Sequence, residues 1–156
     1  MDKKIFFAIL ILFAVDIFFG YFVYQKKYGG VGDVSRVCFD SDCFAVEIAA
    51  TAAEREKGLM ERQSLDADKG MLFIYDKPGY YSFWMKNTLI PLDMVWLDQD
   101  RRVVFINENA QPCKDERCPV VTPVIESQYV FEAGAGTVKK IGLRYGDKAK
   151  LILYAK

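Results

Sequence analysis

The stretch Tyr81–Asp93, which reads YSFWMKNTLIPLD, decides the fold class that the sequence predicts. It places an apolar triplet, Phe83–Met85, directly before a polar triplet, Lys86–Thr88. Large apolar side chains beside a cation, an amide and a hydroxyl indicate a strand that belongs partly to a core and partly to a polar rim. The stretch therefore predicts a β-rich domain that carries one candidate polar surface.

Other short strand-like segments lie on both sides of this stretch, bounded by turn residues such as Asp76–Gly79. They are Val34–Phe39, Phe44–Ala50, Gly70–Tyr75, Asp93–Asp98, Arg102–Asn107, Gln128–Phe131 and Ala149–Tyr154. Several have apolar residues at consecutive positions, which is typical of strands buried on both faces. We expect a mainly β (β-rich α+β) domain, a small barrel or sandwich of about seven or eight short strands.

Two short helices complete this prediction. Thr51 and Glu54 have the spacing of a capping box, and Gly58 is expected to end the helix that they begin. A second helix is predicted from Thr137, as N-cap, to Gly142.

The composition excludes several functional classes. The formal net charge is zero, and no basic run or nucleic-acid motif is present, so no nucleic-acid partner is expected. The chain contains no histidine, which excludes histidine-dependent triads and histidine-containing zinc sites. Any catalysis would depend on carboxylates, lysine, tyrosine or thiols.

The N-terminal residues 1–30 are predicted to be a membrane anchor and linker, and residues 31–156 the β-rich domain. Lys3 and Lys4 precede an apolar run, Ile5–Tyr24, of about the length that spans a bilayer. The run is longer than the apolar region of a secretory signal and lacks a clear cleavage site, so an uncleaved transmembrane helix is favoured over a cleaved signal. We expect a single-pass protein of the cell membrane, with its domain on the extracytoplasmic side.

The four cysteines form two groups with the same spacing, Cys38 with Cys43 and Cys113 with Cys118. Each pair flanks a polar, turn-like loop, and an even number of cysteines behind an anchor favours two local disulfides in an oxidising compartment. A four-cysteine metal site would use closer C-x-x-C spacing, and a redox site would place C-x-x-C at a helix start. We therefore expect disulfides and no metal site or cofactor.

Several separated motifs occur together in one order. They are Glu47-Ile-Ala-x-Thr51, Glu54-Arg55-x-x-Gly58-Leu-Met60-x-Arg62, Gly70-Met-Leu-Phe73, Phe83-Trp-Met-Lys-Asn-Thr88, Ile90-Pro-Leu-Asp93, Cys118-Pro119 and Glu132-Ala-Gly134. Across residues 34–154 the sequence resembles the prokaryotic domain-of-unknown-function 192 family, an uncharacterised membrane-associated group. The resemblance implies a compact β-rich domain behind a signal or anchor, and it implies no reaction. Cys38 and Cys43 depart from the family pattern and are interpreted as an added disulfide.

One polar surface is the candidate ligand site. Its predicted residues are Arg55, Arg62, Lys86, Asn87, Thr88 and Asp93. Cations beside an amide and a hydroxyl suit a carboxylate, a phosphate or a sugar. The purely structural interpretation is that Lys86 pairs with Asp93 and that the arginines are solvated. Met60, Met71, Met85 and Met94 could bind copper(I), but core packing is the better interpretation.

We expect a non-catalytic binding or interaction module for a small ligand, anionic or sugar-like, or for an envelope protein. The alternative is a lysine/aspartate-dependent enzyme that acts on an envelope-derived substrate. A third hypothesis is a structural module whose anchor associates through Asp16.

Overall fold

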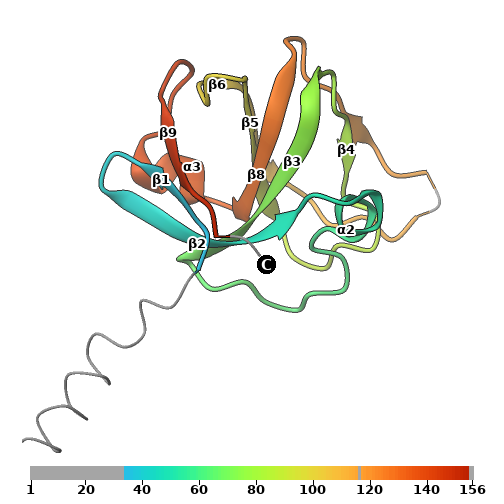
Figure 1. Ribbon diagram of the computed structural model, residues 1–156. Helices are drawn as coiled ribbons and strands as arrows, with labels where there is room; N and C mark the ends of the chain where they lie inside the picture. Colours follow the sequence, from blue (N-terminus) through green and yellow to red (C-terminus); the bar gives the residue numbers. More distant parts are fainter. Residues whose placement is uncertain (1–33, 116, 155–156) are drawn as a thin grey trace, which may run out of the picture. The chain divides into compact units, whose positions relative to one another are not determined.

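The computed structural model describes residues 34–115 and 117–154, and Ser35–Lys156 forms one compact unit. Its strands are β1 (Arg36–Phe39), β2 (Asp42–Ala49), β3 (Lys69–Gly79), β4 (Phe83–Trp84), β5 (Leu92–Leu97), β6 (Val103–Ala110), β7 (Val120–Val121), β8 (Ser127–Gly134) and β9 (Ala149–Ile152). Its helices are α2 (Ala52–Lys57) and α3 (Thr137–Ile141). Figure 1 shows α2 near β4 on one side of the main sheet and α3 on the side of β1 and β9.

Seven strands form one curled sheet in the order β6-β5-β8-β3-β2-β1-β9. All neighbours are antiparallel except β2 and β3, which run parallel and are joined by the segment that contains α2. The curl brings the two edge strands together at one end, where Arg102 bridges to Lys148 and the amide of Ala149 donates to the carbonyl of Arg101 at 2.9 Å. The sheet is therefore a half-barrel.

Successive side chains along each strand point to opposite faces of the sheet, and each face has its own core. In β3, Leu72 faces an inner core within the curl, whereas Met71 and Phe73 face an outer core on the other side. The inner core contains Val37, Phe39, Phe44, Val46, Leu72, Val95, Leu97, Val103, Phe131, Ala133, Val138, Leu143 and Ala149. The outer core contains Ala49, Leu59, Met71, Phe73, Phe83, Met85, Leu92, Met94, Trp96 and Val130.

A small second layer covers the outer core. β4 and β7 pair into a two-stranded sheet, and Phe83 of β4 packs edge-on against Phe73 and Trp96 at centroid distances of 4.8 and 5.5 Å. The Trp96 indole nitrogen donates to the carbonyl of Tyr81 at 2.8 Å, which fixes the chain just before β4. This layer explains why strands such as β5 are apolar at nearly every position: both of their faces are covered.

The prediction of a mainly β domain with two short helices is confirmed, and the barrel is a half-barrel. Two local predictions are wrong. Tyr81–Asp93 does not form one strand of the main sheet, because only Phe83–Trp84 is a strand and it belongs to the second layer. Thr137 is not the N-cap of α3; Gly136 has that position, and the Thr137 hydroxyl donates to the carbonyl of Gly134.

Both predicted disulfides are present. Cys38 and Cys43 are register partners across the β1–β2 hairpin, and Cys113 bonds to Cys118 in the loop that precedes β7. The predicted anchor, residues 1–30, lies outside the described residues. Among the residues that are described, no helix has the length and apolar character needed to cross a membrane.

Gly70 marks the closest approach between the central strands, β3 and β8. A Cβ atom at this position would lie 2.4 Å from the carbonyl oxygen of Glu132 and 2.6 Å from Cε2 of Phe131. The carbonyl belongs to the β3–β8 pairing and the ring is buried, so neither can move away without disturbing the core. We therefore expect Gly70→Ala to lower the free energy of unfolding by about 3 kcal/mol. Urea denaturation followed by far-UV circular dichroism would measure the loss.

Gly134→Ala, at the C-terminal end of β8, is the matched control. No atom lies within 4 Å of the Cβ position at Gly134, so we expect a change of about 0.5 kcal/mol or less. Equal effects of the two substitutions would contradict the packing explanation.

Candidate functional site

A groove opens over the outer core, between the α2 segment and the chain that follows β4. Its deep end, the inner pocket, has a volume of about 30 Å³, and its wide mouth, the outer pocket, has about 440 Å³. Both pockets are lined by Glu56, Lys57, Met60 and Trp84. The inner pocket adds Arg55, Gly58, Leu59, Phe73, Phe83, Thr88 and Glu132, and the outer pocket adds Ala53, Glu61, Lys86 and Asn87.

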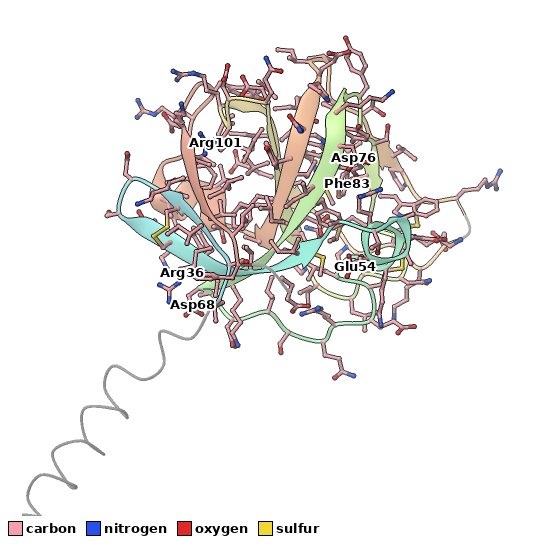
Figure 2. The ribbon with its side chains drawn as sticks, in the orientation of Figure 1. Arg36, Glu54, Asp68, Asp76, Phe83 and Arg101 are labelled. Atoms are coloured by element: carbon pink, nitrogen blue, oxygen red, sulfur yellow. A yellow bond between two sulfur atoms is a disulfide. The ribbon has the colours of Figure 1, made fainter. Side chains whose placement is uncertain are left out.

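The first wall is α2 and the turn after it. The Thr51 hydroxyl accepts from the amide of Glu54 at 3.2 Å, and the Glu54 carboxylate accepts from the amide of Thr51 at 3.0 Å, so the predicted capping box is formed. Arg55 donates to the carbonyls of Ala50 and, at 3.0 Å, of Ile74. These bonds anchor a very short helix to the strands beneath it; Figure 2 labels Glu54 on this helix.

Gly58 brings the turn down onto the outer core. Its φ of 46° lies in the region that favours glycine, and a Cβ there would approach Cζ of Phe73 to 3.2 Å. The close contact lets Leu59 reach the core, where it is 2% exposed. The turn thus forms the rim of the inner pocket.

The second wall is the chain from Met85 to Thr88. Asn87 has a φ of 54°, a left-handed conformation that asparagine tolerates better than most residues. Its carbonyl accepts from the amide of Glu61 at 2.8 Å, which joins the two walls directly. Its amide donates to the carbonyl of Cys113 at 3.0 Å, and the amide of Cys113 donates to the carbonyl of Met85 at 3.2 Å. The Cys113–Cys118 disulfide therefore lies behind this wall.

Glu132 forms the floor of the inner pocket. It lies in β8, opposite Met71 of β3 and Met94 of β5, and its side chain is on the outer-core face, as is that of Val130. The residue is 4% exposed. Its carboxyl group makes no hydrogen bond or ion pair with any of the residues that the structure describes. No fully buried side-chain oxygen among these residues lacks a partner, so the carboxyl group is open to the inner pocket.

Burial controls the protonation of the groups around this floor. Loss of hydration raises the pKa of Glu132 to about 8, because the charged carboxylate has no partner to replace water. Burial also raises the pKa of Tyr75 to about 12; the nearby Arg55 guanidinium opposes that shift and the Glu132 carboxylate adds to it. Near neutral pH, Glu132 is therefore mostly a neutral acid that can donate a hydrogen bond.

The two predicted arginines are engaged within the domain. The guanidinium of Arg62 donates to both carboxylate oxygens of Glu47 at 2.5 and 2.7 Å, and this bond raises the pKa of Arg62. Arg55 lines the inner pocket but also lies over the Tyr75 ring, 4.8 Å from its centroid. Both arginines thus hold the α2 segment in place.

Lys86, Asn87 and Thr88 do meet at the groove. Lys86 and Asn87 line the outer pocket, and the Lys86 ammonium lies over the Trp84 ring at 5.3 Å from its centroid. Thr88 lines the inner pocket and is 4% exposed. These residues remain candidates for ligand contact.

Asp93 lies apart from the groove, on the inner-core side of β5. It is 1% exposed, and its two carboxylate oxygens accept from the amides of Asn109 and Val138, each at 2.8 Å. The bond to Val138 supplies the capping interaction for α3 that Thr137 was expected to provide. Among the described residues no ion pair joins Asp93 to Lys86.

Most of the groove residues were not in the predicted site, among them Lys57, Met60, Trp84 and Glu132. The sequence did contain a signal for Glu132, since an acidic residue stands between Phe131 and Ala133 in an otherwise apolar strand. Trp84 is 45% exposed, in contrast to Trp96 at 0%. Local pattern alone does not show which aromatic ring lines a groove.

The groove is a candidate small-molecule site on the chemistry of its lining. Within residues 34–115 and 117–154, no cluster of histidine, cysteine, aspartate or glutamate is suited to a metal ion. The groove instead combines aromatic rings, one buried carboxyl group and two lysines at its mouth. This combination is typical of sites that orient a ligand through a few polar groups on apolar walls.

A curled half-barrel with a groove of this kind defines a class of small β-rich domains, and comparison assigns the chain to one family. Residues 36–151 match DUF192, described as "Uncharacterized ACR", and the chain belongs to this family. No curated protein matches the chain.

Two solved structures share the fold. A crystal structure of a candidate transcription regulator from Sinorhizobium meliloti 1021 is 35% identical, with a TM-score of 0.68 and coverage of 75% of this chain and 91% of that chain. A protein of unknown function from Novosphingobium aromaticivorans DSM 12444 is also 35% identical, with a TM-score of 0.68 and coverage of 75% and 83%.

Proposed function

We propose that the domain is a non-catalytic binding module that holds a small molecule in the groove between α2 and the Met85–Thr88 segment. The observation that carries the proposal is the inner pocket, whose floor is Glu132, a residue 4% exposed whose carboxyl group has no hydrogen-bond partner among the described residues and opens into the pocket. A buried polar group without a hydrogen bond is costly, so it indicates a site where a ligand or water completes the bonding.

The mouth of the groove supports the same proposal. Trp84 exposes nearly half of its surface beside the outer pocket, and the Lys86 ammonium is held over its ring. An exposed indole next to charged side chains offers a flat apolar surface with polar groups at its edge, which suits stacking of a small ligand.

The geometry favours binding over lysine/aspartate catalysis. Asp93 is buried, and both of its oxygens accept backbone hydrogen bonds, so it is poorly placed to act on a substrate beside Lys86. The proposed setting is the extracytoplasmic face of a cell membrane. Its support is the apolar segment Ile5–Tyr24 in the sequence and the two disulfides, which persist in oxidising compartments.

The test is a ligand screen of the full-length chain with small anions, sugars and amines. Binding is read as thermal stabilisation and as a change in Trp84 fluorescence. A ligand at a hundredfold over its dissociation constant should add about 2.7 kcal/mol to the free energy of unfolding. Trp84→Ala and Lys86→Ala should weaken binding, whereas Lys139→Ala, an exposed residue of α3, should not.

Two results would overturn the proposal. One is the absence of saturable stabilisation by every compound in the screen. The other is binding that Trp84→Ala and Lys86→Ala leave as strong as Lys139→Ala does, since the ligand would then occupy another part of the molecule.

A further inference from the structure

Glu132 is fixed in place by the sheet around it. Its strand, β8, pairs with β3 on one side and with β5 on the other, so its backbone is held in ladders at both edges. A one-residue shift of the strand would exchange the inner-core and outer-core faces, which burial forbids. The carboxyl group therefore cannot withdraw toward solvent by a local adjustment of the chain.

The surroundings of the carboxyl group offer it no compensation. Its nearest neighbours across the sheet are Met71 and Met94, and the inner pocket is walled by Phe73, Phe83 and Trp84. A core that needed only to be filled would be more stable with an apolar residue of the same size at this position. The carboxyl group thus has the character of a recognition group.

The charged and titratable groups that face Glu132 are few. Arg55, Glu56 and Lys57 of α2 line the same pocket, and Tyr75 of β3 interacts with Glu132 electrostatically. The Arg55 guanidinium is directed to the carbonyls of Ala50 and Ile74, and Glu56 and Lys57 are exposed at the rim. No cation among the described residues is bonded to the carboxyl group.

We propose that the inner pocket receives the ammonium group of a small amine, which pairs with the Glu132 carboxylate between the rings of Phe73, Phe83 and Trp84. This inference rests on the proposed function and names the ligand class for the same groove. An aromatic pocket stabilises a cation through the ring faces, and an ion pair gains strength where water is excluded. An anionic group would instead be repelled by the carboxylate whenever Glu132 ionises.

The volume of the inner pocket sets the size of the group that enters it. About 30 Å³ accommodates one or two water-sized groups, which is enough for an ammonium head but not for a whole metabolite. The remainder of the ligand would lie in the outer pocket against Trp84. There Lys57 and Lys86 favour ligands whose far end is neutral or anionic.

Pairing of this kind releases a proton. Near neutral pH the amine enters as its ammonium form, the neutral Glu132 acid loses its proton to the buffer, and the carboxylate and ammonium remain paired. As the pH increases toward the pKa of Glu132, which is about 8, affinity for the amine should therefore rise by about tenfold per pH unit. Calorimetry in buffers of different ionisation enthalpy would count the released proton.

The experiment compares butylamine, butanol and butyrate, which share a chain length and differ in their polar end. The full-length chain and its Glu132→Gln variant are titrated between pH 6 and pH 8. At pH 8, butylamine should bind at least about tenfold more tightly than the other two probes, and Glu132→Gln should lose that preference together with its pH dependence. Circular dichroism confirms that the variant is folded.

Each other outcome overturns the inference and separates it from the proposed function. Equal or tighter binding of butyrate or butanol, or an unchanged amine affinity in Glu132→Gln, excludes ammonium recognition while leaving a ligand groove in place. A dissociation constant for butylamine weaker than about 10 mM excludes it as well. If the wider screen also finds no ligand, the proposed function fails with it.

Discussion

Replacing Glu132 with glutamine is expected to remove most of the pH dependence of stability between pH 5 and pH 8. Burial raises the pKa of Glu132 from its ordinary 4.5 to about 8 in the folded protein, whereas the unfolded chain keeps the ordinary value. Between these values the folded state holds a proton that the unfolded state releases. The free energy of unfolding is therefore highest below pH 4.5 and falls as the pH rises through this interval.

The size of the effect follows from the width of the interval. Each pKa unit corresponds to about 1.4 kcal/mol, so the wild-type protein should lose about 4 kcal/mol between pH 4.5 and pH 8 from this residue. Glutamine does not titrate, and the variant should therefore show a nearly flat profile. Urea denaturation at a series of pH values would measure both curves, and no histidine contributes to them because the chain contains none.

Glu56→Gln is the matched control. Glu56 lines the same groove but is exposed, so its replacement should leave the slope of the wild-type profile unchanged. Parallel profiles for the wild type and Glu132→Gln would show that the carboxyl group is hydrated or paired in solution, and they would also remove the basis of the ammonium site.

Asp93→Ala is expected to lower the free energy of unfolding by about 4 kcal/mol, because it leaves one buried and one partly buried backbone amide without an acceptor. Asp93 accepts from Asn109, at the end of β6, and from Val138, in the first turn of α3. Its side chain therefore joins two segments far apart in the sequence to the centre of the sheet. Asp93→Asn retains one acceptor oxygen and should lose about half as much.

Asp98→Ala provides the comparison for this prediction. Asp98 also accepts from a backbone amide, that of Arg102 at 2.8 Å, but this bond is exposed, so its loss should cost about 1 kcal/mol. If Asp93→Ala were as mild as Asp98→Ala, the carboxylate would not be structural. If Asp93→Ala abolished ligand binding without lowering stability, Asp93 would be a ligand-binding residue, as the sequence predicted.

Much of the local structure could be predicted because its causes are local. The capping box of Thr51 and Glu54, the left-handed C-cap at Gly142 and the paired cysteines all act over fewer than about six residues. The consecutive apolar residues of several strands also predict burial on both faces. These features give the fold class without any knowledge of which strand pairs with which.

The site could be predicted only in part because its causes are long-range. Lys86, Asn87 and Thr88 reach the groove, since a polar triplet beside an apolar one marks the edge of a core. Glu132 was missed because a polar residue in a strand normally faces solvent, whereas here it is covered by the α2 segment and β4, which are remote in the sequence. Asp93 was included in the predicted site because the backbone amides that bind it, at Asn109 and Val138, are remote in the sequence and cannot be seen in the local pattern.

The place of β8 in the sheet has a consequence for biosynthesis. β8 separates β3 from β5, although both precede it in the chain, so the middle of the sheet is supplied by the second-last strand. A nascent chain that ends before Ser127 leaves one edge of β3 and one edge of β5 without their native partner, and it contains no floor for the groove. Such long-range pairing slows folding and prolongs the exposure of strand edges to aggregation. The domain should therefore acquire its native sheet only late in translation or after release from the ribosome.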